Sequence, residues 1–249
     1  MSLASHEYYN STQHPIACAL FVVPLLAAYE LGLAFLEIDN PHTLRNGADT
    51  WLIWTFSRIG LRVSYLPGTL VGIGLVGWAW ANCKNIPKEL PGVWMGMLLE
   101  SVLLALGLWG LSRALGPLVD YAGLPLAAGT KCDPAIAQIV SFVGAGVYEE
   151  VVFRLLLLTM ILKVFQLGDV GQQPSQMLAI VVSALLFSAA HHVGAAGEEF
   201  QGYVFLFRFL AGIYFAVIFQ RRGFGVAVGA HTGYDLLVGV ILATPVSGM

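Results

Sequence analysis

The chain has 249 residues, of which 57% are hydrophobic and only 11% are charged. A typical soluble domain has roughly 25% charged residues, and a soluble fold could not cover this much apolar surface with polar groups. The net charge of −3 includes no basic run, which argues against a nucleic-acid partner. The composition therefore predicts a multi-pass integral membrane protein whose apolar excess faces the lipid bilayer.

The predicted elements begin after a polar N-terminal segment, residues 1–15, which contains no Lys or Arg and so lacks the charged start of a cleavable signal peptide. A membrane span needs about 20 mostly apolar residues. Segment 50–61 is too short to span and is expected to lie at the interface or to enter the membrane partway. The candidate spans, in chain order, are residues 16–36, 65–81, 93–115, 136–158, 177–193, 203–220 and 224–243.

The connectors between these spans are short, and no change in composition marks a second domain. We therefore predict one membrane domain, residues 16–249, that is an all-α bundle of about seven transmembrane helices, with six to eight as the range. Lys and Arg divide evenly between the two sides of such a bundle, so the positive-inside rule gives no orientation.

Several expected spans carry ionisable side chains, each of which costs ~2.5–3.5 kcal/mol at the bilayer centre. Such residues are retained where they face protein or a water-filled cavity and have a partner or a function. The groups within or at the edge of the spans are Glu30, Glu100, Glu149, Glu150, Arg154, His191, His192, Arg208, His231 and Asp235.

The fourth span holds the densest of these groups, Glu149, Glu150 and Arg154. Glu150 and Arg154 are four residues apart, so they share a helix face and are expected to form an ion pair that fixes helix packing. Glu149 is rotated by about 100° from that pair and has no partner on its own helix. A chemical role is therefore expected for Glu149.

Two later spans carry histidines. His191 stands four residues after Phe187 and is either a hydrogen-bonded packing residue or a catalyst. His231 and Asp235 are also four apart, and this pair suits an oriented base, two metal ligands or a packing couple. Glycines recur every fourth residue on the last span and favour close helix packing, namely Gly225, Gly229 and Gly233. A carboxylate and two histidines on three spans are together the kinds of residue that activate a water molecule for hydrolysis.

These segments resemble the CPBP family of intramembrane proteases, which comprises the CAAX proteases and the bacteriocin-processing enzymes of the Abi group. Its motifs are E-E-x-x-x-R, F-x-x-x-H and H-x-x-x-N/D, on successive membrane helices. Here they read Glu149-Glu150-Val-Val-Phe-Arg154, Phe187-Ser-Ala-Ala-His191 and His231-Thr-Gly-Tyr-Asp235, and the family-like core covers about residues 135–243.

The resemblance implies a water-filled catalytic cavity in the four C-terminal spans and hydrolysis of a peptide bond in a membrane-tethered substrate. It implies that Glu149 is the base that activates water, assisted by His191. His231 and Asp235 would stabilise the oxyanion, while Glu150, Arg154 and Phe187 support the site. Whether the substrate is prenylated stays open.

Asp235 departs from the better-known CAAX endopeptidases, which have an Asn there that can donate to an oxyanion. An ionised Asp only accepts hydrogen bonds, so we expect Asp235 to orient His231 or to bind a metal. A metalloprotease with zinc on His191, His231 and Glu149 or Asp235 is one interpretation. The lack of an H-E-x-x-H motif favours the metal-free one.

Two other functions fit parts of the pattern. A proton- or ion-coupled transporter also carries Glu and His at membrane depth, although the chain lacks paired broken helices in two halves. A catalytically silent membrane scaffold could retain the motifs for packing alone.

Overall fold

The computed structural model describes residues 3–36, 45–121, 135–194 and 197–242. Within these ranges the regular structure is helical, which confirms the predicted all-α class. Lys131, which entered the charge count, and the last residue of the expected final span lie outside them. The elements are α1 Leu3–Thr12, α2 Pro15–Leu36, α3 Gly47–Arg58, α4 Leu66–Ala81, η1 Cys83–Asn85, α5 Leu90–Tyr121, α6 Ala135–Glu150, η2 Val151–Leu158, α7 Thr159–Leu167, α8 Gln172–Ala190, α9 Gly202–Arg222, α10 Phe224–Leu236 and η3 Leu237–Ile241.

The expected spans coincide with helices of the structure. Among the described residues, 5 helices are long and apolar enough to cross a membrane, namely α2, most of α5, α8, α9 and the run from α10 into η3. The chain is thus an all-α multi-pass membrane protein, as predicted. The expected span at 65–81 is α4, whose 16 residues reach about 24 Å, short of the ~30 Å hydrocarbon core. Helix α3, with 12 residues, is too short to span, as predicted.

The expected span at 136–158 is divided between α6 and the π-helical segment η2, which begins directly after Glu150. A π-helix has a wider turn than an α-helix and often occurs at functional sites. The hydroxyl of Ser183 on α8 donates a hydrogen bond of 2.9 Å to the carbonyl oxygen of Phe153 in this segment. Helix α8 therefore holds the widened turn from outside.

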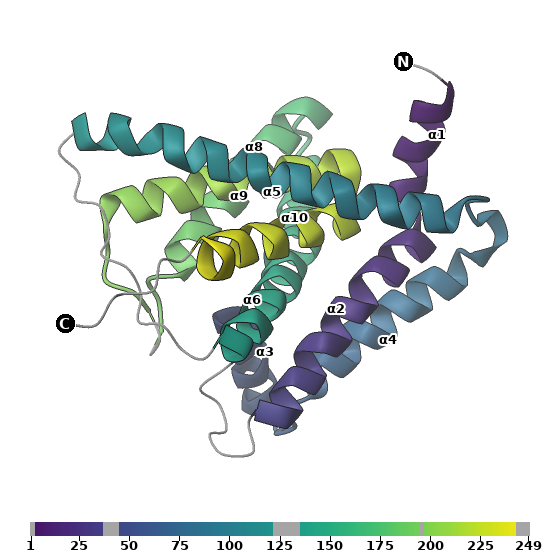
Figure 1. Ribbon diagram of the computed structural model, residues 1–249, viewed down its shortest axis with the longest axis horizontal. Coiled ribbons are helices and arrows are strands. Elements are labelled where there is room, and N and C mark those ends of the chain that lie inside the picture. The colour runs from purple at the N-terminus through teal and green to yellow at the C-terminus, as the bar shows by residue number, and fades with distance from the viewer. Residues whose placement is uncertain (1–2, 37–44, 122–134, 195–196, 243–249) are drawn as a thin grey trace.

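Helix α10 is the centre of the bundle, and it packs against α2, α5, α6 and α9. Its residues Phe224–Thr232 are all buried. Figure 1 shows α10 in yellow beside the long helix α5, with α2 and α4 running together on the right of the view. The glycine strip lies against α5, because a side chain on Gly225, Gly229 or Gly233 would press on Met97, Ser101 or Ala105, respectively. The predicted packing role of the strip is confirmed.

The polar N-terminal segment forms α1 and is tied to the bundle by ionic contacts. Tyr8 donates to Glu100 on α5 at 3.0 Å, and Glu100 pairs with Arg222 at the end of α9 at 2.5 Å. Burial and the neighbouring carboxylate of Glu100 raise the pKa of Tyr8 to about 12. One of the ionisable groups noted in the sequence, Glu100, therefore serves to anchor α1.

Candidate active site

Two close helix contacts bring the candidate residues together. Gly146 on α6 has no room for a side chain because Thr232 of α10 lies against it. One turn after Gly146 comes Glu150, and directly before Thr232 comes His231, so this contact places the acidic pair beside the histidine. Gly212 on α9 similarly lies against the backbone of Ala184 on α8. Helices α6, α8, α9 and α10 therefore surround one point.

Glu149 lies between the two histidines. Its Oε2 atom is 3.8 Å from Nε2 of His191 and 3.7 Å from Nε2 of His231. These distances are longer than a direct hydrogen bond, and a water that lies beside each pair can reach both atoms at hydrogen-bond distance. The side chains of Glu149 and His191 keep exposed fractions of 13% and 23%. The carboxylate that the sequence left without a partner thus reaches both imidazoles and remains accessible.

The ring of His191 is fixed by its own helix. Its Nδ1 lies 2.9 Å from the carbonyl oxygen of Phe187, and a carbonyl only accepts, so Nδ1 carries the hydrogen. In the neutral imidazole, Nε2 then presents a lone pair toward Glu149. A water between these two groups can donate one O–H to each of them.

His231 is held on three sides. Its Nδ1 lies 2.8 Å from Oε1 of Glu150, its Nε2 lies 3.6 Å from Oδ2 of Asp235, and its ring stacks on Phe215 with centroids 4.4 Å apart. The sequence assigned the orienting role to Asp235, but the hydrogen bond to the ring comes from Glu150. The reason is tertiary: α6 and α10 meet closely enough for Glu150 to reach Nδ1, while Asp235 lies on the Nε2 side.

The predicted ion pair between Glu150 and Arg154 is confirmed, at 3.0 Å, with exposed fractions of 0% and 1%. The guanidinium of Arg154 also lies over the rings of Phe187 and Phe215, at 4.4 and 5.4 Å from their centroids. Its Nη2 donates to the carbonyl oxygen of Gly212 at 3.4 Å. Arg154 therefore joins η2 to α8 and α9 next to the site, and the ring of Phe187 packs against its guanidinium.

The structure also contains polar contacts that the sequence did not indicate. Arg208 on α9 pairs with Glu198, on the segment between α8 and α9, at 2.7 Å. Tyr29 of α2 donates to buried Asp49 of α3 at 2.9 Å, and Tyr148 donates to Glu30. For the contact between Tyr29 and Asp49, the available sequence signal is Asn46. Its side chain caps α3 and so marks the start of the helix that carries Asp49, three residues later. These tyrosine contacts fasten α2 and α3 to α6 just before Glu149.

A zinc site needs at least three protein ligands that converge on one point. Within the described ranges, no group of three or more His, Cys, Asp or Glu side chains is placed to hold a metal ion. The close pairs instead follow one another from His191 to Glu149, to His231 and to Asp235. The described residues therefore give the metalloprotease interpretation no support.

A separate apolar cavity of about 460 Å³ lies between α3, α4 and η2. The residues that line it include Leu52, Phe56, Leu70, Gly74, Val151 and Leu155. Val151 and Leu155 belong to the segment that follows Glu150, so the cavity borders another face of the helix that carries the acidic pair.

The comparisons with known proteins agree with this geometry. Residues 132–237, less than half of the chain, match the family model described as Rce1-like, type II CAAX prenyl endopeptidase Rce1-like. No curated protein and no solved structure matches the chain. The match confirms the resemblance to the CPBP proteases and favours a peptidase over a transporter or a scaffold. Residues 132–237 therefore resemble an Rce1-like domain, and the match indicates that this multi-pass membrane protein is an intramembrane peptidase of the CAAX type.

Proposed function

We propose that the chain hydrolyses a peptide bond of a membrane-tethered substrate with a water activated by Glu149. The observation that carries this proposal is the position of the Glu149 carboxylate, within 3.8 Å of Nε2 of both His191 and His231. A general base must lie within hydrogen-bond reach of the proton that it removes, directly or through one water. A water bound between Glu149 and His191 meets that condition.

The reaction then proceeds in two steps. Glu149 takes a proton from the water, the water oxygen bonds to the carbonyl carbon, and an electron pair moves onto the carbonyl oxygen. In the second step the C–N bond breaks, and Glu149 returns the proton to the leaving nitrogen. The products are a new amine and a new carboxylic acid, which keeps the second proton of the water until it ionises.

The oxyanion of the intermediate needs a hydrogen-bond donor, and His231 is the group that we propose. Its Nδ1–H donates to Glu150, so a lone pair at Nε2 would face the carboxylates of Glu149 and Asp235, at 3.7 and 3.6 Å. Facing acceptors repel each other, so a proton must lie on Nε2 or on one of the two carboxylates. A proton on Nε2, balanced by the surrounding acids, makes His231 a donor that is fixed before the oxyanion forms.

The substrate class that we propose is a peptide with an isoprenoid group near its C-terminus, as the description of the matching family names it. The apolar cavity between α3, α4 and η2 supports this class. An isoprenoid chain in that cavity would contact Val151 and Leu155, on the helix that carries Glu149. The peptide would then lie near the base, while its lipid group stays in an apolar environment.

The test is cleavage of a farnesylated peptide by purified protein in proteoliposomes, followed by mass spectrometry. We expect Glu149→Gln to lower kcat by ~10²–10⁴, the usual contribution of a general base. The matched control is Glu89→Gln, because Glu89 is an exposed carboxylate at the start of α5 and should leave cleavage unchanged. Full activity of Glu149→Gln would reject the mechanism, and ion flux without any cleavage would favour the transporter.

A further inference from the structure

Helix α6 is held from two sides at the end that carries the acidic pair. Successive residues of an α-helix are rotated by about 100°, so Tyr148 and Glu150 point in nearly opposite directions and Glu149 points between them. On the Glu150 side, α10 lies close, as the contact of Gly146 with Thr232 shows. The other side faces α2, which packs along α6. The direction of Glu149 therefore depends on the contacts that hold these two sides.

The contact with α2 is made by Tyr148. Its side chain is fully buried, its hydroxyl donates a hydrogen bond to Oε1 of Glu30, and its ring meets the ring of Tyr29 edge-on with centroids 5.4 Å apart. A hydrogen bond to an ionised carboxylate is roughly twice as strong as one between neutral groups. Gly144, one turn before Tyr148, has no room for a side chain because the ring of Tyr29 lies against it. Helix α6 therefore cannot turn about its axis without disturbing both contacts.

The same hydrogen bond is covered by α4 and braced by α3. Gly68, in the first turn of α4, has no room for a side chain, because the Glu30 carboxylate and the Tyr148 hydroxyl lie against it. The hydroxyl of Tyr29 donates to the fully buried Asp49 of α3 at 2.9 Å. Helices α2, α3, α4 and α6 thus meet at a buried polar cluster that begins one residue before the proposed base.

The position of Glu149 depends on such support because its own helix changes form there. The π-helical segment η2 begins at Val151, two residues later, so the regular α-helical hydrogen bonds do not continue past the base. Side chains end about 5–6 Å from a helix axis, so a turn of α6 by about 10° moves the carboxylate by about 1 Å. Oε2 of Glu149 lies 3.8 and 3.7 Å from Nε2 of His191 and His231. A misplacement of about 1 Å at a reacting group can cost ~10² in rate.

We propose that Tyr148 is a positioning residue, whose hydrogen bond to Glu30 fixes the rotation of α6 and so holds the Glu149 carboxylate at the reacting water. This inference rests on the proposed function and adds to it two residues outside the three motifs. Tyr148 and Glu30 act through the helix and not on the substrate. Breaking their hydrogen bond should therefore lower the rate and not the affinity for the peptide.

The test measures kcat and KM separately, with purified protein in proteoliposomes and a farnesylated peptide. Tyr148→Phe removes the hydroxyl and keeps the ring, so we expect kcat to fall ~10- to 100-fold while KM stays within about twofold of wild type. Glu30→Gln keeps an acceptor oxygen for Tyr148 and should retain most of the activity, whereas Glu30→Ala should lose as much kcat as Tyr148→Phe. The double variant of Tyr148→Phe and Glu30→Ala should be no slower than either single variant, because all three lose the same interaction.

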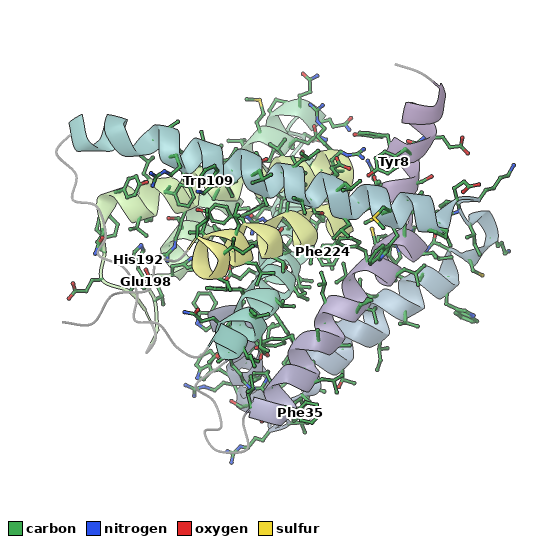
Figure 2. All side chains as sticks on the ribbon, in the orientation of Figure 1. Tyr8, Phe35, Trp109, His192, Glu198 and Phe224 are labelled. Carbon is green, nitrogen blue, oxygen red and sulfur yellow. The ribbon has the colours of Figure 1, made fainter. Side chains whose placement is uncertain are left out.

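The matched control is Tyr8→Phe. Tyr8 also donates to a glutamate, Glu100, at 3.0 Å, but it lies on α1, and Figure 2 shows it beside the long helix α5 and away from α6. This variant loses the same kind of hydrogen bond and should keep the wild-type kcat.

A second pair of variants disturbs the contact without removing either partner. In Gly68→Ala the new methyl group would lie against Oε1 of Glu30 and the hydroxyl of Tyr148, and these two side-chain ends would have to separate. In Gly72→Ala, one turn later on α4, the methyl group would contact Leu26 at 3.7 Å, an ordinary van der Waals distance. We expect Gly68→Ala to lower kcat as Tyr148→Phe does, and Gly72→Ala to leave it unchanged. This comparison tests the proposal even if Tyr148→Phe does not fold.

Several outcomes would contradict the inference. Wild-type kcat in a folded Tyr148→Phe or in Gly68→Ala, with Glu149→Gln inactive, would overturn the role of Tyr148 and leave the proposed function intact. A raised KM at unchanged kcat would assign Tyr148 to substrate binding and overturn it as well. Equal losses in Glu30→Gln and Glu30→Ala would show that the hydrogen bond does not position the base. Failure of the wild-type protein to cleave the peptide would reject the proposed function, and this inference with it.

Discussion

Replacing Arg154 by alanine tests whether the buried ion pair holds the site together. Arg154 and Glu150 have exposed fractions of 1% and 0%, and their closest atoms are 3.0 Å apart. The variant would leave the Glu150 carboxylate in the protein interior with His231 as its remaining ionic partner. Removing one partner of a buried pair costs ~3–5 kcal/mol, because the other charge is left uncompensated. The lost contacts with Phe187 and Phe215 add to this cost.

The assay is the free energy of unfolding in mixed detergent micelles, followed by circular dichroism. We expect Arg154→Ala to lose at least ~3 kcal/mol. The matched control is Arg208→Ala, because its pair with Glu198 has the same chemistry but is exposed, and exposed pairs contribute ~0–1 kcal/mol. The two variants differ mainly in the burial of the carboxylate left behind.

A double-mutant cycle separates the ion pair from packing. Glu150→Gln combined with Arg154→Ala should cost less than the sum of the single variants, by ~0.5–3 kcal/mol, since the stranded charge is gone. The reasoning would be refuted by additive losses, or by an Arg154→Ala protein as stable as wild type. A stable but inactive Arg154→Ala protein would assign Arg154 to the chemistry instead.

Three further predictions concern the reaction and its substrate. Asp235→Asn should keep most of the activity, because Glu150 already orients His231 and an Asn amide can donate a hydrogen bond to the oxyanion. Asp235→Ala, which leaves no polar group at position 235, should lose ~10²–10³ in kcat; equally inactive variants would contradict this. Cleavage should survive dialysis against a strong metal chelator, since among the described residues no group of three His, Cys, Asp or Glu side chains is placed to hold a metal; loss of activity that added zinc restores would overturn the metal-free mechanism. Gly74→Phe should raise KM for a farnesylated peptide by filling the apolar cavity, whereas Gly77→Phe, on the same helix and also in open space, should not. An equal effect of both variants on KM would show that the cavity does not bind the substrate.

Much of the fold and of the candidate site could be read from local sequence patterns. The apolar excess predicted a helical membrane protein, because a chain in lipid must satisfy its backbone hydrogen bonds within helices. The spacing of Glu150 and Arg154 predicted their ion pair, and the glycine strip predicted close packing of the last helix. Each of these properties depends on residues within one helix, so the sequence alone contains the information.

The detailed form of two expected spans was not predicted. Hydropathy recognises apolar runs, but it does not show where a helix begins and ends. Helix α4 begins at Leu66, one residue after the expected start, and its 16 residues are short for a span. The run after Ala135 changes to a π-helix at Val151. The turn is widened where Ser183 of another helix binds its backbone, which a local pattern cannot reveal.

The partners within the site were decided only by the tertiary structure. The sequence paired His231 with Asp235, four residues away on the same helix, and left Glu149 without a partner. In the folded chain, Glu150 accepts the hydrogen bond from the ring of His231, and Glu149 lies near both His191 and His231. The sequence by itself showed which ionisable groups lie within the apolar spans. Their energetic cost at that depth indicated that they have a partner or a function. Which of them meet depends on how closely the helices approach, and the contact between Gly146 and Thr232 sets that distance across 86 residues of chain.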